Sequence, residues 1–510
     1  MVLVADRTLS ASYKVLFEGI FATMQTTQVP SLAMRRFVSP PARTDRGGRA
    51  LTAPLGLRRL EAVLLAGTSL TADQVVVTTP EALGRLLGPH VKAVGVSSSD
   101  PLGYGMSNTT TSSFWSGRLY TAHWMDRMMA RIRQAKDRHG FRVVAGGAGA
   151  WQYLAHPEQI DAHGIDVVFD GFCEAQAPKL FSDLIEGRSV EPVVREALTV
   201  ADLAQPIRGA SLLGIIELSR GCGRGCGFCT SGSRRMEHLG VETILADLRT
   251  NVAAGQCNVV SGSEDLFRYG SRDGRVDFDK LHALLTAMRQ VQGLRFMQID
   301  HANIASVAQL DDEQLRETRR LLTWSRPTDY LWVNMGVESA NGRLVAANSP
   351  GKLAPYRPED WEDLVLEVTE KTLRTGFYPV LSLVLGLPGE TLDDVRRTRR
   401  LVERIDALGA VIFPVFHEPL DSRRTGRFSL ETMTHEHLDL YTACYEINFR
   451  RVPALFWDNQ RAGGTFWAKR TAMQLLGKLE VRAWRKNFAR VRRAIGDRPA
   501  AGRTPQPDAT

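Results

Sequence analysis

The chain has 510 residues, of which 44% are apolar and 24% charged, as in an ordinary globular protein with room for two or three domains. Its net charge is +8, from 64 basic and 56 acidic residues. Six cysteines at uneven spacing do not form a disulfide framework, and no apolar run is long enough to span a bilayer, so we expect a soluble cytoplasmic protein.

The first region, residues 1–190, alternates short β-branched runs with stretches of helical periodicity. It opens with MVLVADRTLS, which has no signal-peptide cleavage site. The predicted strands are 2–5, 74–79, 92–99, 142–147 and 166–171. Such strands interleaved with helices predict a doubly wound, flavodoxin-like parallel sheet. Ligands of these sheets bind beyond the carboxyl ends of the strands, which here lead into glycine-containing loops at 97–105, 146–151 and 170–175.

A second α/β region follows at 213–428, after a proline-containing linker at 191–212. It begins at GIIELSR, and helical sequence separates the later apolar runs, including a helix from about 241 to 254. The predicted strands after the first are 258–267, 295–301, 330–340, 378–391 and 410–422. About six β/α units predict a partial (β/α)6 barrel, which places its chemistry at the carboxyl ends of the strands.

The C-terminal region, 429–497, is expected to be helical, and 498–510 is expected to be a disordered tail. The stretch from Lys469 to Arg503 contains eleven basic residues and only two acidic ones, and its apolar residues recur at helical spacing. We interpret this charge as a solvated helix face, and expect no nucleic-acid partner because no recognition motif accompanies it. Four aromatic residues are expected to form a small helical core or, alternatively, to cap a substrate site: Trp457, Phe466, Trp467 and Trp484.

Three cysteines lie within eight positions in SRGCGRGCGFCTSGS, the loop after the first strand of the second region. Cys222, Cys226 and Cys229 can converge on one soft metal centre. A structural zinc site needs four ligands, and the other cysteines have no paired spacing: Cys173, Cys257 and Cys444. Three thiolates on a 4Fe–4S cluster leave one iron open for another ligand. We therefore predict that these three cysteines bind a 4Fe–4S cluster, with a zinc loop as the alternative.

The spacing Cys-x3-Cys-x-aromatic-Cys, with Phe228 as the aromatic residue, resembles the signature of the radical S-adenosylmethionine (SAM) superfamily. The resemblance implies that the open iron binds SAM, and that reduction of the cluster by a donor such as flavodoxin or ferredoxin yields a 5′-deoxyadenosyl radical. SGSED stands where this family places a Gly-Gly-Glu motif, so Glu264 or Asp265 is expected to hold the amino group of SAM. Phe228 is expected to bind SAM, and Glu338, in GVESA, is expected to lie near it.

The first region resembles the cobalamin-binding domain of the cobalamin-dependent subfamily, through VVAGGAGAW and DVVFDGFCEAQAPKLF. This resemblance covers about residues 1–430 and implies that cobalamin binds at the sheet's carboxyl edge. The residues expected to bind it are Ser98, Asp100, Gly146, Gly147, Gly171 and Glu174. The Asp-x-His-x-x-Gly motif that supplies a histidine to cobalt is absent, so no lower axial ligand is predicted. Cys173 is expected to be a buried small residue.

These resemblances imply a cobalamin-dependent radical SAM methyltransferase. Its substrate would be a small molecule or peptide in antibiotic biosynthesis. The carbon methylated would be unactivated, for example in a pyrrole or indole ring. The alternatives are a radical cyclase or oxidase without methyl transfer, and a non-catalytic cobalamin or redox sensor. A transfer-RNA methylthiotransferase is disfavoured, because its N-terminal domain should carry three cysteines and this one has only Cys173. No catalytic residue is assigned; candidate pocket walls are Tyr104, Trp115, Trp151, His301, Asn334 and His417.

Overall fold

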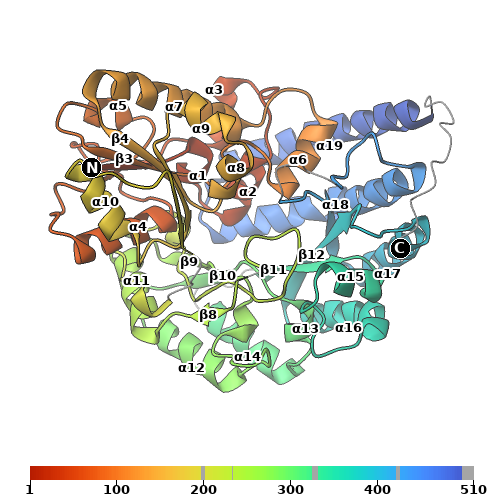
Figure 1. Cartoon of the computed structure of the whole chain (residues 1–510). Coiled ribbons are helices and arrows are strands. Elements are labelled where there is room, and N and C mark those ends of the chain that lie inside the picture. Colours follow the sequence, from red (N-terminus) through yellow and green to blue (C-terminus); the bar gives the residue numbers. More distant parts are fainter. Residues whose placement is uncertain (197–200, 233, 324–330, 421–425, 497–510) are drawn as a thin grey trace, which may run out of the picture.

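The computed structural model consists of two α/β units, each built on parallel strands, and a pair of long helices (Figure 1). The structure describes residues 1–196, 201–232, 234–323, 331–420 and 426–496. The predicted tail, 498–510, lies outside the described residues. Within the described ranges, no helix is both long and apolar enough to cross a membrane.

Six parallel strands form the N-terminal sheet, in the order β2-β1-β3-β4-β5-β6. They are β1 (Val2–Ala5), β2 (Val76–Thr78), β3 (Ala93–Ser97), β4 (Arg142–Gly146), β5 (Val167–Gly171) and β6 (Val193–Glu196). The first five lie where the sequence predicts them. The sixth lies inside 191–212, which the sequence analysis interpreted as linker. Because β6 is a short edge strand with two half-buried valines, it lacks the apolar run that marks a central strand.

Helices cover both faces of this sheet, which confirms the doubly wound fold. One face packs on α4 (Leu55–Gly67) and α10 (Ala177–Ile185). The other packs on α7 (Tyr120–His139) and α8 (Ala150–Ala155). Burial on both faces explains why the strands read as nearly continuous apolar runs. Shorter helices complete the domain: α1 (Arg7–Ser10), α2 (Leu16–Thr23), α3 (Ser31–Ala33), α5 (Leu83–Leu86), α6 (Met106–Phe114) and α9 (Glu158–His163).

The second unit is the predicted partial barrel. Its strands are β9 (Asn258–Ser261), β10 (Phe296–Ile299), β11 (Leu331–Glu338), β12 (Phe377–Leu385) and β13 (Val411–Phe416). Parallel bridges from Ile216 to Ser261 and from His301 to Asn334 connect the first strand segment, β9–β10 and β11–β13 in barrel order. The first segment ends in β7 (Ser219–Arg220), which pairs antiparallel with β8 (Glu237–His238). The outer helices are α11 (Val241–Ala253), α12 (Phe278–Arg289), α13 (Ile304–Val307), α14 (Asp312–Leu322), α15 (Gly342–Asn348), α16 (Trp361–Arg374) and α17 (Leu392–Leu408).

The C-terminal region forms α18 (His435–Ala462) and α19 (Trp467–Gly496), and α18 packs on β13 (Figure 1). An aromatic cluster joins these helices to α6 and β13: Phe114, Phe416, Tyr441, Tyr445, Trp484 and Phe488. The expected core role is therefore confirmed for Trp484. It is wrong for Trp457, Phe466 and Trp467, because among the described residues their side chains stay 37%, 66% and 61% exposed.

Buried ion pairs join the two α/β units. Arg220, at the end of β7, donates from Nη2 to Oε1 of Glu174 at 2.7 Å, and both side chains are almost fully buried. Arg59 on α4 pairs with Asp247 on α11, also at 2.7 Å. Glu174 follows β5, so the first pair brings the carboxyl edge of the N-terminal sheet against the strand that leads into the cysteine loop. The two units therefore meet at their ligand-binding edges.

Candidate functional site

The cysteine loop, residues 221–232, owes its course to glycine. Gly221, Gly223 and Gly225 have φ of 66°, 66° and 70°, a left-handed conformation that other residues rarely adopt. A Cβ on Gly221 would lie 2.6 Å from the carbonyl oxygen of Arg235, so the return strand also excludes a side chain there. The Gly225 amide donates to the Gly232 carbonyl at 2.8 Å and closes the loop.

The three thiols of this loop are free and half-buried. Burial raises the pKa of Cys222 to about 11 and raises the pKa of Cys229, so a metal must displace protons to bind them. Within the described part of the chain, no three His, Cys, Asp or Glu side chains gather as ligands of one metal ion. In a 4Fe–4S cluster each thiolate binds a different iron, so three free thiols on one glycine-rich loop fit that group. Their role as cluster ligands stays a prediction.

Arg224, between the first two cysteines, anchors the loop to the barrel. Its buried guanidinium donates from Nη2 to Oδ2 of Asp265 at 3.0 Å and to Oγ of Ser306 at 2.8 Å. Its Nη1 donates to the carbonyl oxygens of Gly351 and Lys352 at 3.0 and 3.2 Å. Arg224 was not predicted from the sequence, although a long cationic side chain between two candidate ligand cysteines could have indicated its role as an anchor.

The structure distinguishes Glu264 from Asp265. Asp265 is 1% exposed, and both of its oxygens accept hydrogen bonds, from Arg224, Ser306 and the Asn303 amide. Glu264 is exposed and accepts from Oγ of Ser231, in the cysteine loop, at 2.8 Å. Asp265 therefore holds the loop in place, while Glu264 presents a carboxylate beside the cysteines that is free to hold an ammonium group.

Glu338 ends β11 in an unusual conformation and forms a buried ion pair. Its φ of 64° lies in the left-handed region, and the strand register shifts between Gly336 and Glu338. Its carboxylate accepts from Nζ of Lys352, which the sequence analysis did not single out. The pKa of Lys352 is raised: burial alone lowers it, but the charge of Glu338 outweighs that effect. The pair lies close enough to the cysteine loop for Cys226 to act on the charge of Lys352.

Gly336 leaves the room that this ion pair occupies. A Cβ at position 336 would overlap both Oε1 of Glu338 and Nζ of Lys352. We expect Gly336→Ala to separate the pair and to lower the free energy of unfolding by about 1–3 kcal/mol. Urea unfolding followed by circular dichroism measures this. The matched control is Gly240→Ala, where an added Cβ meets nothing within 4 Å, and an equal loss in both variants would contradict the assignment.

Asp300 and His301 follow the carboxyl end of β10 and lie beside Asn334, in the middle of β11. Nδ1 of His301 is 3.2 Å from Oδ2 of Asp300, and Nδ2 of Asn334 donates to Oδ1 of Asp300 at 3.3 Å. The sequence analysis named His301 and Asn334 as pocket walls but missed Asp300. No spacing signal marks that residue, because the contact with Asn334 crosses 34 positions of the chain.

The other predicted wall residues are occupied elsewhere. The His417 ring meets Phe228 edge-to-face, with ring centroids 6.4 Å apart. Phe228, which was expected to bind SAM, is buried in a small apolar cluster, and its contact with SAM stays a prediction. Nδ1 of His417 lies 3.2 Å from the Gly426 carbonyl oxygen. Trp115 packs against Trp484 in the aromatic cluster. Tyr104 stacks near His156 in the N-terminal domain, and Trp151 is half-buried on α8.

Most of the side chains predicted to bind cobalamin form hydrogen bonds or ion pairs with other residues of the protein. Ser98 donates to Oδ2 of Asp6 at 2.7 Å. Asp100 accepts from the Gly105 amide at 3.0 Å and from Gln152 at 2.6 Å, and so fastens the loop after β3 to α8. Glu174 lies in the buried ion pair with Arg220, because β5 ends against β7. These contacts shape the sheet's carboxyl edge, and the binding of cobalamin by these side chains stays a prediction.

The predicted glycines serve close backbone contacts, and one of them leaves backbone accessible. A Cβ on Gly147 would lie 2.7 Å from Oγ of Ser97, and one on Gly171 would overlap Glu196. Gly146 is half-buried, whereas Gly147 and Ala148 are exposed at the end of β4. This edge can therefore receive a large ligand through backbone groups, which is how the residues present fit cobalamin. Cys173 is half-buried against the apolar core, and burial raises the pKa of its thiol.

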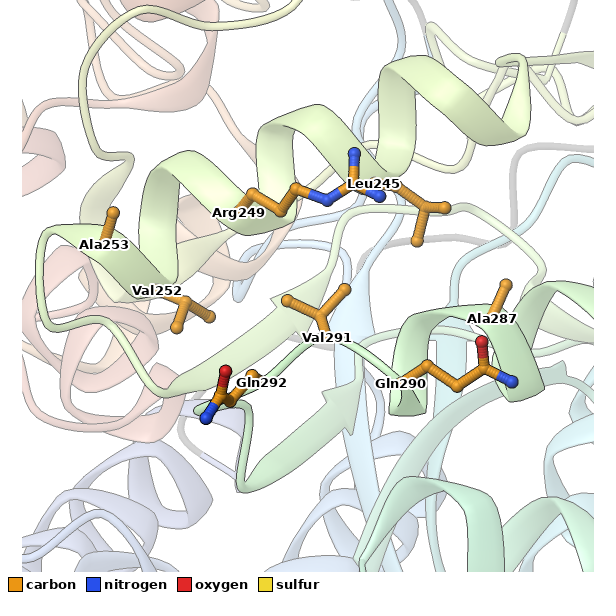
Figure 2. A pocket seen from close by; sticks show the side chains of 8 residues that line it. All are labelled: Leu245, Arg249, Val252, Ala253, Ala287, Gln290, Val291 and Gln292. Carbon is orange, nitrogen blue, oxygen red and sulfur yellow. The ribbon is translucent and has the colours of Figure 1, made fainter.

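A groove of about 510 Å³ lies away from this site, between α11 and the end of α12 (Figure 2). Leu245, Arg249 and Val252 of α11 face Ala287 and Val291 across it (Figure 2). Barrel helices run antiparallel to the strands, so the ends of α11 and α12 lie at the amino ends of the strands. The groove is therefore on the face opposite the cysteine loop and is no candidate for its chemistry.

Fold and site together define a class: a partial (β/α) barrel with three cysteines in the loop after its first strand, set against a doubly wound sheet. Residues 216–402 match the model of the Radical SAM superfamily. This part of the chain is therefore similar to a radical SAM domain, and radical SAM chemistry implies a 4Fe–4S cluster and SAM.

The curated relatives of this chain include methylthiotransferases. The chain is 26% identical over 270 residues to the ribosomal protein uS12 methylthiotransferase RimO of Anaeromyxobacter sp. (strain Fw109-5), with 51% of this chain and 53% of the relative covered. It is 25% identical over 289 residues to the tRNA-2-methylthio-N(6)-dimethylallyladenosine synthase of Leifsonia xyli subsp. xyli, with 56% and 51% covered. The chain thus spans about half the length of these relatives.

Among solved structures, the chain resembles the radical SAM methyltransferase TsrM from Kitasatospora setae. The complex with tryptophan substrate and a SAM analogue matches with a TM-score of 0.53 and 16% identity, over 81% of this chain and 72% of TsrM. The complex with cobalamin and a [4Fe-4S] cluster matches with the same TM-score and 15% identity, over 81% and 74%. At this identity the likeness concerns the fold.

Proposed function

We propose that this protein is a cobalamin-dependent radical SAM methyltransferase that methylates an unactivated carbon of a small molecule or peptide in secondary metabolism, such as a pyrrole or indole ring. The observation that carries the proposal is the juxtaposition of two ligand-binding edges. The Glu174–Arg220 pair ties the sheet's carboxyl edge to β7. Met106, at the start of α6, packs on the same apolar cluster as Phe228, Cys226 and Cys229.

When bound, the cluster with SAM supplies hydrogen abstraction from an unreactive carbon, and cobalamin supplies a methyl donor. Cys222, Cys226 and Cys229 would hold the cluster, with electrons from a flavodoxin or ferredoxin. Glu264 offers an accessible carboxylate to the amino group of SAM, and the Glu338–Lys352 pair borders the same space. The backbone around Gly147 would receive cobalamin. The protein's task is to place the substrate between the two edges and to exclude water.

The methylthiotransferase relatives raise a second reading, that this chain transfers a methylthio group. The residues argue against it. Such chemistry is expected to need a second cluster on the N-terminal domain, held by three cysteines, and residues 1–190 hold only one cysteine, Cys173, whose thiol lies against the apolar core. Two further alternatives are a radical cyclase or oxidase and a sensor. The products formed from SAM distinguish the first from the proposed methyltransferase, and the absence of SAM consumption distinguishes the second.

The test is anaerobic and uses the full chain. The purified protein is reconstituted with iron and sulfide, supplied with hydroxocobalamin and desalted, and iron and cobalamin are counted. We expect about four irons per chain and about one cobalamin. Incubation with SAM, reductant and candidate aromatic substrates should then yield both 5′-deoxyadenosine and S-adenosylhomocysteine.

Four irons without cobalamin would overturn the methyl-carrier part of the proposal. Cobalamin with 5′-deoxyadenosine but no S-adenosylhomocysteine would favour the cyclase or oxidase. Bound cofactors without any consumption of SAM would favour a sensor. The matched control is Cys257→Ala, which removes a half-buried thiol of the same domain outside the loop and should behave as the native chain.

A further inference from the structure

His301 is an accessible basic side chain among the polar groups that border the candidate site. Its side chain is 49% exposed, at the carboxyl end of β10. Protein surrounds the ring closely enough to desolvate it, so the ring is neither part of the core nor freely solvated. Within the described residues, Nδ1 is directed to Asp300 and no residue pairs with Nε2.

Asp300 and Asn334 fix the orientation of this imidazole. Asp300 offers Oδ2 to Nδ1 of His301 at 3.2 Å, and its Oδ1 accepts from Asn334 at 3.3 Å. The backbone holds the same corner together, because the Ala302 amide donates to the Asn334 carbonyl at 3.0 Å and the Leu266 amide to the His301 carbonyl at 3.1 Å. An imidazole with one nitrogen facing a carboxylate that the next strand fixes is pre-organised to bind a ligand with its other nitrogen.

The charges that face His301 come from three elements. Asp300 is its neighbour, Glu264 follows β9, and Lys352 follows α15. Desolvation lowers the pKa of His301 and Lys352 lowers it further, but Asp300 and Glu264 outweigh them and raise it to about 9. The ring is therefore an imidazolium at neutral pH, with N–H donors at both nitrogens and no acceptor.

We propose that His301, oriented by Asp300 and Asn334, binds a carboxylate group of a molecule held at the candidate site. The inference deepens the proposed function and rests on it for the meaning of that site. The imidazolium donates its Nε2–H to one carboxylate oxygen, a charge-assisted hydrogen bond. Glu264 lies close enough for its charge to act on the same ring, so an ammonium group of the same molecule would find its partner beside it.

A carboxylate fits this position better than a phosphate. Lys352, the other cation that acts on the ring, is already paired with Glu338. The carboxylates of Asp300 and Glu264 would repel the second negative charge that a phosphate can carry and a carboxylate group lacks. The carboxylate can belong either to SAM or to the substrate, and the experiment separates these two sources.

The test follows the imidazole itself in the full-length chain, labelled with 13C at Cε1 of histidine. His301→Gln identifies the resonance by its disappearance. Sodium acetate at pH 7.5 should shift this resonance saturably, acetamide should not, and sodium phosphate should bind more weakly. Raising the pH through 9 should abolish the acetate response, because the ring loses its proton. His282, which is exposed on α12 and paired with Glu317, is the internal control and should respond to none of these probes.

Absence of a saturable acetate shift, or an equal response to acetamide, would overturn the proposal. Asp300→Asn should lower the pH at which the His301 resonance titrates and weaken acetate binding about tenfold or more. In the reconstituted enzyme, competition between SAM and acetate would assign the carboxylate to SAM, and undiminished acetate binding beside SAM would assign it to the substrate. The acetate titration needs neither iron nor cobalamin, so its failure is distinct from failure of the proposed function.

Discussion

Replacing Cys222, Cys226 or Cys229 singly by alanine should reduce iron in the reconstituted protein from about four per chain to less than one. SAM cleavage to 5′-deoxyadenosine should fall to background. The physical reason is that a cluster with three protein thiolates has no spare ligand, so loss of one leaves two irons without protein support. Iron analysis, the visible spectrum of the cluster and chromatography of the nucleoside products measure these effects.

Cys257→Ala is the control for this experiment, since it removes a half-buried thiol of the same domain outside the loop. The thermal midpoint of the metal-free chain should change little in all four variants, because the thiols of the loop are half-buried and make no disulfide. Retention of full iron and full SAM cleavage by any of the three loop variants would contradict the assignment of that cysteine as a ligand.

Arg220→Met should lower the free energy of unfolding by about 3–5 kcal/mol. Arg220 is 2% exposed and pairs with Glu174, 1% exposed, at 2.7 Å and with Glu217 at 2.8 Å. Its guanidinium also lies over the Phe172 ring, 4.4 Å from the centroid. Removal of the cation leaves the buried Glu174 carboxylate without its ion-pair partner and leaves Glu217 with only Arg59, 3.5 Å away, at the junction of the two units. Urea unfolding of the metal-free chain measures the loss.

The double variant Arg220→Met with Glu174→Gln should regain part of that loss, because it removes one of the stranded charges. Arg343→Met is the matched control. Arg343 is 78% exposed and pairs with Glu359, which is 52% exposed, so its loss should cost about 0–1 kcal/mol. Equal destabilisation by Arg220→Met and Arg343→Met would show that the interdomain pair contributes no more than a surface pair.

Much of the fold is legible in local sequence patterns. The run YPVLSLVLGLPG is apolar at nearly every position and becomes β12, which is buried along almost its whole length. Strands β1, β3 and β4 and helix α11 lie at or close to their predicted limits. Strand β6 was not predicted, because an edge strand needs little apolar surface and is specified by its pairing with β5.

In the candidate site, too, features formed by neighbouring residues were predictable from the sequence, and features that depend on distant contacts were not. The three cysteines and the glycines between them are adjacent in the chain, so their spacing alone points to a metal-binding loop. Glu264 and Asp265 are also adjacent, yet their roles separate only because Arg224 reaches one of them across 41 positions. The Asp300–His301 pair is likewise local, but Asn334 joins it through strand pairing.

Amino-acid order therefore specifies the type of each unit and the chemistry of the cysteine loop, because periodicity and ligand spacing are properties of neighbouring residues. Chain folding assigns the partners. It places Glu174 against Arg220, pairs Glu338 with Lys352, and leaves His301 accessible and within reach of the charge of Glu264. These outcomes depend on which strand ends meet in space, and burial and ion pairing between distant segments carry no signal in either segment alone.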